Sequence, residues 1–405
     1  MRIHEFVDEG LVHSSYLIDL GDGAAALVDP PRFPTEQERL VDHLGLRLAW
    51  TIDTHSHADY LTRSPGVAAR RGAVFIAPAA SHLATPYRPV VDGEHLELAP
   101  GVELIPIATP GHTPDHHAYL LTDHGIPEVL FSGGSLMVGT VGRTDLCGPD
   151  LAEPLAHEMF HGLHRFDDLP DSVLLYPTHG AGSFCSAPGS TDRTSSLGAE
   201  RRTNPLLRIT NEDRFVRQLL DGFGSFPSYF ARLPELNRLG PTRYDLVPTL
   251  ADLTPDEVER RIAAAAVLVD CRSIEEFAAG HLPDSLSNML RSVFASWVGW
   301  LVEPGGPIIF VLDDNQSRDD AVRQCLDVGQ ENLADPRRPS PVASPRGGIQ
   351  VATCTGSTSS DPTISAMSSL TCGRPTNMRP ATSRAHATSS SGPWRPSHSS
   401  RYPSR

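Results

Sequence analysis

Short apolar runs alternate with Gly, Pro and Asp turns over roughly the first two hundred residues of the chain. Eight runs have the length and composition of strands, namely SSYLIDL, AAALVDP, LAWTIDT, AVFIAP, VELIPIAT, HAYLLT, EVLFSGG and VLLYPTH. Three stretches between them predict helices: TEQERLVDHLG, GVAARRG, and EPLAHEMFHGLHRF, whose apolar residues recur at three-to-four spacing. Because helices and strands interleave, the pattern predicts an α/β layered domain.

A second α/β pattern follows a break. Residues of about 186–245 are irregular and rich in Arg and Pro, which predicts an excursion and a linker. After them come AAAVLVDCRS, IEEFAAGHL, PIIFVLDD and RDDAVRQCLDVG, which predict strand, helix, strand and helix. The sequence therefore predicts a first domain over 1–205, an extension over 206–250, a shorter domain over 251–330, and a tail over 331–405.

The tail differs from the rest in composition. It holds sixteen Ser and nine Arg against three acidic residues, with no apolar periodicity. Such a segment cannot bury enough apolar surface to offset the entropy lost on ordering, so we expect it to be disordered. A shifted reading frame near Asp335 would also produce this abrupt change.

The charge balance narrows the function. The 405 residues include 34 Lys and Arg against 49 Asp and Glu, a net charge of -15. A surface this acidic repels nucleic acids and anionic membranes, so a small-molecule substrate fits better. There is no apolar run of about 18 residues, and MRIHEFVDEG lacks the basic and apolar regions of a signal peptide. The six cysteines form no CxxC pair, which favours reduced thiols and a cytoplasmic protein.

The strongest chemical signal is the segment HSHAD, which comes directly after the predicted strand LAWTIDT. It places His55, His57 and Asp59 in a sharp turn, and Zn(II) and Fe(II) both favour imidazole and carboxylate ligands. His112 in PGHTP and His179 in PTHGAG each follow another apolar run. Four histidines and an aspartate at strand ends predict a metal site.

The order HSHAD, PGHTP, FSGGSLMVGTVGRTDL and PTHGAG resembles the metallo-β-lactamase superfamily, whose fold is an αββα sandwich with a metal pocket at one edge. PTHGAGSFCSAPGSTDRTSSLGAERRTNPLL and FPSYFARLPELNR resemble the branch of iron persulfide dioxygenases fused to rhodanese domains. LVDCRSIEEFAAGHLPDSLSN is similar to the first half of a rhodanese domain. The expected fold is thus a metallo-β-lactamase-type αββα sandwich, a partial rhodanese-like domain, and the tail.

The resemblance implies roles for single residues. The superfamily's metal positions fall on His55, His57 and His112, with Asp59 and His179 around a second position. Tyr60 stands where two-metal members often have a histidine, which favours one ion.

The superfamily's usual Gly-Asp, whose carboxylate binds metal, here reads Gly133-Gly134. His55 and His112 would then hold Fe(II) with His57, Asp59 or Asp145 as substitutes. A His55, His57 and His112 site would instead suit Zn(II) with a bound water.

Further candidates surround the metal residues. Asp59 and Tyr60 are the candidate catalytic residues. Asp59 is a candidate base or orienting group, and Tyr60 either hydrogen-bonds in the pocket or fills the space of the missing histidine. Candidate substrate-binding residues are Arg143 and Asp145 in VGRTDL, and Arg201 and Arg202, whose guanidinium groups could bind a carboxylate such as that of glutathione.

Three functions remain open at this stage. The resemblance favours oxidation of a low-molecular-weight persulfide, of the glutathione persulfide type, to sulfite with one Fe(II). Hydrolysis of a thioester with one Zn(II), or a catalytically degenerate scaffold protein, are the alternatives. The expected partners are small-molecule thiols or persulfides and not nucleic acid or membrane, with a homodimer as a further option.

The rhodanese-like domain lacks its expected nucleophile. Sulfur transfer requires a cysteine of low pKa in the loop after a central strand, but the loop after IIFV reads LDDNQSRDD. Cys271 and Cys325 lie elsewhere in the domain and are expected to be structural. We therefore expect this domain to be inactive in sulfur transfer.

Overall fold

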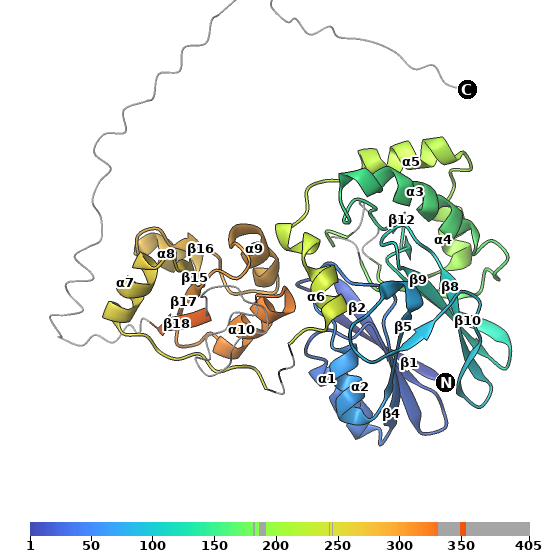
Figure 1. Ribbon diagram of the computed structural model, residues 1–405, viewed down its shortest axis with the longest axis horizontal. Coiled ribbons are helices and arrows are strands. Elements are labelled where there is room, and N and C mark those ends of the chain that lie inside the picture. The colour runs from blue at the N-terminus through green and yellow to red at the C-terminus, as the bar shows by residue number, and fades with distance from the viewer. Residues whose placement is uncertain (181–182, 186–191, 243, 245, 331–348, 354–405) are drawn as a thin grey trace, which may run out of the picture. The chain divides into compact units, whose positions relative to one another are not determined.

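The computed structural model describes residues 1–180, 183–185, 192–242, 244, 246–330 and 349–353 (Figure 1). These residues belong to one compact unit that extends from Met1 to Ser357. The tail predicted for 331–405 therefore lies outside the described residues, except for 349–353.

Two six-stranded sheets form the first domain. The first sheet has the order β1 (Arg2–Asp8), β2 (His13–Asp19), β3 (Ala24–Val28), β4 (Arg47–Ile52), β5 (Val74–Pro78) and β6 (Arg88–Val90). The second has the order β14 (Ser195–Ser196), β13 (Leu174–Pro177), β10 (Ile126–Gly133), β9 (His117–Asp123), β8 (Val102–Ala108) and β7 (Leu96–Ala99). A small hairpin pairs β11 (Leu136–Met137) with β12 (Thr140–Val141). All eight strands predicted from the apolar runs are present.

The sheets pack face to face because their strands alternate in side-chain direction. On β2, Tyr16 and Ile18 join Tyr119 and Phe131 of the second sheet in the central core, whereas Leu17 points to the opposite face. Each fully buried side chain of this size contributes about 1.5–3 kcal/mol of hydrophobic free energy. The shared core holds the two sheets as the middle layers of a sandwich.

Helices cover both outer faces of this sandwich (Figure 1). α1 (Thr35–His43) and α2 (Ser64–Arg71) bury Val41 and Val67 against the first sheet. α3 (Pro149–His164) and α5 (Glu212–Asp221) bury Met159 and Phe215 against the second sheet. The first domain is an αββα sandwich, as expected.

The extension is more regular than its sequence predicts. Within the stretch of about 186–245 lie three helices, α4 (Leu197–Thr203), α5 and α6 (Leu233–Leu239), as well as a 3-10 turn, η2 (Ser228–Ala231). On α5 the buried residues Phe215, Val216 and Leu219 have helical spacing, and the Asn211 side chain caps the helix by accepting a hydrogen bond from the Arg214 N–H. The prediction of an irregular segment was wrong because the helices are short and separated by prolines.

The second domain is built around a parallel sheet of order β16 (Leu286–Ser287), β15 (Val267–Asp270), β17 (Ile308–Leu312) and β18 (Ile349–Thr353). Its helices are α7 (Pro255–Ala263), α8 (Ile274–Ala279), α9 (Phe294–Leu301) and α10 (Arg318–Asp327). β18 was not predicted. It lies inside the segment expected to be disordered, and its IQVAT sequence pairs with β17 in register from Ile308 opposite Ile349.

The loop after β17 runs from Asp313 to Ser317 and holds no cysteine. Cys271 and Cys325 are buried in the core of the second domain, and burial raises the pKa of both thiols well above the ordinary value. A thiol with a raised pKa is a poor nucleophile at neutral pH. These locations support the expectation that the domain does not transfer sulfur.

The two domains contact each other through buried polar groups. The backbone N–H of Leu61 donates to the Asp327 carbonyl oxygen at 3.0 Å, and the Arg32 guanidinium donates to the Leu326 carbonyl oxygen at 2.8 Å. Arg32 is 1% exposed, although a guanidinium is rarely buried unless its N–H groups are bound. The second domain is therefore packed tightly against the first at α10.

Asp327 makes this contact depend on pH. Burial, followed by repulsion from Asp8, raises the pKa of the Asp327 carboxyl well above 3.8, and its Oδ1 has no hydrogen-bond partner among the described residues. When the pKa of a carboxyl is raised in the folded state, the folded protein loses stability as the pH rises from about 4 toward that raised pKa.

Asp327→Asn stays neutral, so it is expected to raise the melting temperature more at pH 8 than at pH 5. Relief of about 1 kcal/mol corresponds to roughly 2–4 °C. Thermal unfolding at both pH values tests this, with the exposed Asp314→Asn as control. An equal shift at both pH values would contradict the assignment.

Candidate metal centre

Four histidines from three loops share one buried pocket. His55 and His57 follow β4, His112 follows β8, and His179 follows β13. The ring centroid of His55 lies 4.3 Å from that of His57, 5.0 Å from that of His112 and 5.4 Å from that of His179. No ring is more than 2% exposed. The fold thus brings together residues that lie more than a hundred positions apart in the sequence.

Asp29 fixes the tautomer of His57. The His57 Nε2 atom lies 3.2 Å from Asp29 Oδ1, so this nitrogen carries the proton and donates it to the carboxylate. The other nitrogen, Nδ1, is buried and has no hydrogen-bond partner among the described residues. Its lone pair is therefore available to a metal ion.

The same carboxylate acts on His55 through Thr54. The Thr54 hydroxyl donates to Asp29 Oδ2 at 2.8 Å, so it can only accept from His55 Nδ1, which also lies 2.8 Å away. The proton on Nδ1 leaves the His55 Nε2 lone pair free. Asp29 thus fixes the protons of His57 and His55 so that one nitrogen of each ring is free to bind a metal ion.

His112 is oriented by a backbone group. Its Nδ1 lies 2.8 Å from the Arg143 carbonyl oxygen, which can only accept, so Nδ1 carries the proton. The Nε2 atom is buried and has no hydrogen-bond partner among the described residues. Burial and the neighbouring His179 lower the pKa of His112 to about 3, so the ring is neutral at physiological pH.

Asp59 and His179 complete the pocket. His179 Nδ1 lies 3.2 Å from Asp59 Oδ2, although neither carboxylate oxygen has a hydrogen bond within the described part of the chain. Burial opposes ionisation of Asp59, but the His179 and His57 imidazoles overcome this and lower its pKa below the usual range. The pocket therefore contains a buried carboxylate anion that faces His179 with one oxygen and has its other oxygen available.

These donors fit a metal ion. A proton on His179 Nδ1, favoured by the Asp59 carboxylate, leaves the His179 Nε2 lone pair facing that of His55 Nε2 at 3.4 Å. Two nitrogens bound at about 2.0–2.1 Å to one tetrahedral ion lie roughly 3.3–3.4 Å apart. His55, His57 and His179 each offer one ligand atom, and these atoms lie within 4.8 Å of one another, as the ligands of one cation do.

Sequence reasoning did not single out Asp29, although it ends a predicted strand just as Asp53 does. The Asp29 carboxylate accepts hydrogen bonds from the Thr54 backbone N–H at 2.8 Å and from the Thr178 hydroxyl. Thr178 directly precedes His179, so Asp29 ties together the strand ends that carry three of the four histidines.

Asp29→Asn is therefore expected to lower metal affinity about 10- to 100-fold, as loss of a group that orients ligands typically does. Competition with a chromophoric chelator measures the affinity, and the exposed Asp221→Asn serves as control. Unchanged affinity in Asp29→Asn would show that the network does not orient the ligands.

Gly134 is packed directly against His112. A Cβ atom at this position would lie 2.2 Å from His112 Cδ2, a distance that non-bonded atoms do not adopt. The neighbouring Gly133 has φ +56°, and its backbone approaches His116, whose Nε2 accepts a hydrogen bond from the Gly134 N–H at 2.9 Å. The glycine pair leaves room for two imidazoles where the superfamily pattern has a carboxylate.

Tyr60 lies behind His57, on the side away from its free nitrogen. The Tyr60 hydroxyl is 3.1 Å from His57 Nε2 and 3.1 Å from the Asp29 carbonyl oxygen, and its ring stacks on His57 at 4.4 Å. Burial raises the pKa of Tyr60 well above 10, so it is not a base at neutral pH. This location supports a role in positioning His57, and the predicted catalytic role stays a prediction.

Arg143 and Asp145, which the sequence offers as candidate substrate-binding residues, pair with each other. The guanidinium donates to both carboxylate oxygens of Asp145 at 2.6 and 2.8 Å, and to the Phe184 carbonyl oxygen at 3.0 Å. The Arg143 side chain is 3% exposed. Asp145 is thus engaged by Arg143, which leaves Asp59 as the carboxylate without hydrogen bonds.

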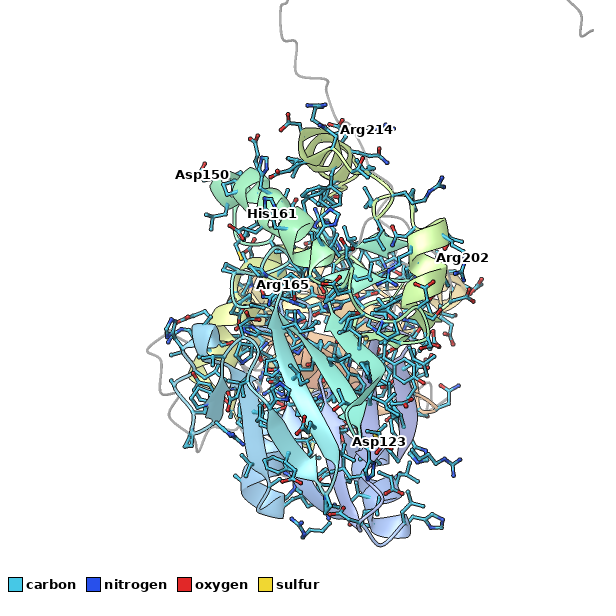
Figure 2. All side chains as sticks on the ribbon, turned by 90° about the vertical axis from the view of Figure 1, so that its right-hand side faces the viewer. Asp123, Asp150, His161, Arg165, Arg202 and Arg214 are labelled. Atoms are coloured by element: carbon cyan, nitrogen blue, oxygen red, sulfur yellow. The ribbon has the colours of Figure 1, made fainter. Side chains whose placement is uncertain are left out.

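Arg201 and Arg202 lie on α4. Arg201 donates to the carbonyl oxygens of Phe166 and Leu169 at 2.6 and 2.8 Å, and it pairs with Asp171. Arg202 is 68% exposed at the outside of the molecule (Figure 2). The structure does not bring either guanidinium into the histidine pocket, and their predicted substrate contacts remain untested.

Cys185 was also missed as a site residue. Its sulfur and single nitrogens of His112 and His179 all lie within 4.8 Å of one another. Burial, followed by the charge of Asp59, raises the pKa of the Cys185 thiol well above 9. Its position after PTHGAGSF gave no separate signal, because metal-binding cysteines are recognised by the spacing between them and Cys185 has no neighbouring cysteine.

Known proteins share both halves of this architecture. The chain matches the Rhodanese-like domain family over residues 254–334. It is 30% identical over 213 residues to the mitochondrial persulfide dioxygenase ETHE1 of Homo sapiens, covering 50% of this chain and 74% of the relative. It is also 30% identical over 216 residues to hydroxyacylglutathione hydrolase of Pseudomonas savastanoi pv. phaseolicola, covering 47% and 80%.

Solved structures agree with the sequence relatives. A metallo-β-lactamase from Staphylococcus aureus subsp. aureus COL superimposes with a TM-score of 0.74 at 27% identity, covering 87% of this chain and 99% of that one. ETHE1 from Myxococcus xanthus superimposes with a TM-score of 0.51 at 27% identity, covering 59% and 98%.

The fold, the histidine pocket and these relatives define a metallo-β-lactamase-fold metalloenzyme, and the chain belongs to the metallo-β-lactamase superfamily. Within it, the chain resembles the persulfide dioxygenase branch with a rhodanese-like domain attached, as its motifs predict. Among the described residues, no helix has both the length and the hydrophobicity that a membrane crossing requires.

Proposed function

We propose that this protein oxidises a low-molecular-weight persulfide to sulfite, with glutathione persulfide as the first model substrate and one Fe(II) ion as cofactor. The persulfide dioxygenase relatives support the reaction class. An Fe(II) ion held by two imidazoles and one carboxylate keeps open positions at which O2 and a sulfur substrate can meet. His55 and His112 would supply the imidazoles through their Nε2 atoms.

The observation that carries this proposal is the buried Asp59 carboxylate, which lies beside His179 in the histidine pocket. Gly134 has no side chain, and Asp145 is bound by Arg143, so neither is free to act as the carboxylate ligand. Asp59 is ionised, buried and without hydrogen bonds in the described part of the chain, and it lies beside His179. We infer that Asp59 takes the place of the carboxylate that Gly134 lacks.

The overall reaction balances without another reductant. One persulfide RSSH, one O2 and one water give one thiol RSH, one sulfite and two protons. The outer sulfur loses four electrons, which O2 accepts, and the S–S bond breaks so that the inner sulfur leaves as the thiol. Burial of the four imidazoles keeps bulk water away from the reacting sulfur.

The test uses the full chain, purified without oxygen and loaded with Fe(II). Oxygen uptake and sulfite formation are measured with glutathione persulfide and with an uncharged alkyl persulfide. The proposal expects equal amounts of O2 consumed and sulfite formed, and strong loss of both in Asp59→Asn. No oxygen uptake with either persulfide by the iron-loaded protein would contradict it.

The rival function is zinc-dependent hydrolysis of a thioester, which the His57 Nδ1 atom favours. With His55 and His112 it provides three imidazoles for Zn(II), which lowers the pKa of a bound water. The hydroxyacylglutathione hydrolase relatives support this reaction class. Thioester turnover by the zinc-loaded protein without O2 would favour hydrolysis, and no activity with either metal would favour the scaffold alternative.

We place the enzyme in the cytoplasm. Cys147, Cys185, Cys271 and Cys325 are free thiols, as expected in a reducing compartment. Recovery of these thiols as reduced groups from cells lysed in an alkylating agent would support the placement. A homodimer stays a prediction.

A further inference from the structure

The rhodanese-like domain lacks a cysteine in its active-site loop, yet it contributes to a cavity that reaches the metal pocket. This cavity has a volume of about 210 Å³. Asp59 lines it from the first domain, and Val293, Ser296 and Trp297, in and just before α9, line it from the second. Part of the wall of a cavity that Asp59 also lines is thus built by a domain that has no other assigned role.

The two domains approach each other closely at this wall, backbone against backbone. Gly10, in the loop between β1 and β2, lines the cavity, and a Cβ atom there would lie 1.9 Å from the Ser292 carbonyl oxygen. The same loop holds Val12 at φ +60°, a conformation that β-branched residues rarely adopt. Strain of this kind persists only where the surroundings fix it, and it concentrates at functional sites.

The cavity is apolar apart from Asp59, two serines and the hydroxyl of Tyr229. Leu11, Phe184 and Phe230 line it from the first domain and its extension, and Trp297 lines it from α9. Trp297 both lines the cavity and is 45% exposed, so it lies at the opening. No Lys or Arg lines it among the described residues.

Arg143 and Arg193, which donate to carbonyl oxygens of lining residues, are engaged by carboxylates of the protein. Arg143 binds Asp145 and the Phe184 carbonyl oxygen, which holds a wall residue in place. Arg193 approaches the Val12 carbonyl oxygen at 3.3 Å and the Glu9 carboxylate at 3.6 Å. A ligand with carboxylates would therefore meet a wall that offers it no guanidinium or ammonium group among the described residues.

We propose that α9 of the rhodanese-like domain forms the outer wall of the substrate cavity, and that this cavity selects persulfides whose organic group is compact, apolar and free of carboxylates. Trp297 is the specificity-determining residue at the opening. The substrate class rests on the proposed function, whereas the ligand preference is a property of the cavity alone. Burial of an apolar group against aromatic side chains supplies the selectivity.

The experiment measures thiol binding, so it does not depend on turnover. Anaerobic calorimetry on the full, Fe(II)-loaded chain compares benzyl mercaptan, which has no carboxylate, with glutathione, which has two. We expect benzyl mercaptan to bind at least about 10-fold more tightly, and Trp297→Ala to remove most of this preference. Leu301→Ala, exposed on the same helix and not lining the cavity, is the matched control and should change neither affinity.

Two further variants keep the test decisive. Trp297→Phe should restore most of the preference lost in Trp297→Ala, and Trp297→Arg should strengthen glutathione binding by adding a cation at the opening. Metal content and melting temperature confirm that each variant is folded. Equal or tighter binding of glutathione by the unmodified protein would overturn the proposal, as would equal losses for both thiols in Trp297→Ala. Absence of oxygen uptake together with the expected binding preference would overturn the proposed reaction and leave the cavity assignment intact.

Discussion

Replacing His112 with alanine is expected to lower metal affinity by more than about 100-fold, beyond the range typical of residues that only orient ligands. The reason is that His112 Nε2 is buried without a hydrogen-bond partner in the described part of the chain, while Nδ1 is fixed by the Arg143 carbonyl oxygen. Loss of the imidazole removes one of the two histidine ligands of the proposed iron site. Oxygen uptake with a persulfide should fall to the level of the metal-free protein.

The control for this experiment is His95→Ala. His95 is 63% exposed and lies far from the pocket in the fold, on the turn before β7. The His95→Ala substitution also removes an imidazole but leaves the proposed ligands in place, so metal content and activity should stay unchanged. Full metal content in His112→Ala, measured after gel filtration, would show that the ion is held elsewhere.

Gly134→Asp is expected to damage the site, even though it recreates the superfamily pattern. A Cβ atom at residue 134 would lie 2.2 Å from the His112 ring, so the ring must move from the orientation that the Arg143 carbonyl oxygen fixes. Overpacking of this kind costs typically 1–3 kcal/mol of folding free energy. We expect a lower melting temperature and at least about a 10-fold loss of metal affinity.

Gly134→Ala separates the steric effect from the carboxylate. Both variants should lose affinity, because both add a Cβ atom. Gly222→Ala is the matched control, since a Cβ atom there would meet only ordinary van der Waals contacts, the nearest atom lying 3.4 Å away. If Gly134→Asp instead gained iron affinity and activity while Gly134→Ala lost them, the assignment of Asp59 as the carboxylate ligand would be wrong.

The sandwich could be predicted because its strands carry strong local patterns. Strands β2, β3, β4 and β9 are buried along most of their length and read as apolar runs in the sequence. β1 is partly exposed throughout and gave no such run. β18 gave no signal because its five residues lie in a segment of biased composition.

The proposed metal residues lie in recognisable sequence motifs, but the groups that orient them do not. His55, His57 and Asp59 lie within five positions, so their spacing is informative. Asp29 acts across 25 positions on Thr54 and 149 positions on Thr178, and only the packing of the two sheets brings these three residues together. Hydrogen bonds between residues so far apart along the chain produce no recognisable pattern in the sequence.

The cavity wall could not be predicted for a similar reason. Helix α9 has the sequence FASWVGWL, which is apolar on several faces because it packs between its own domain and η2 of the extension. A helix of this composition gives no amphipathic pattern from which its partner surface could be inferred. The meeting of Trp297 with a cavity that reaches Asp59 depends entirely on how the domains pack.

Anomalous diffraction at the iron absorption edge, from crystals of the full chain grown with Fe(II), tests the central claim most directly. The account predicts one peak in the pocket, within about 2.0–2.2 Å of His55 Nε2, His112 Nε2 and an Asp59 carboxylate oxygen. An iron peak at any other set of residues, or no peak in protein that contains iron, would contradict it.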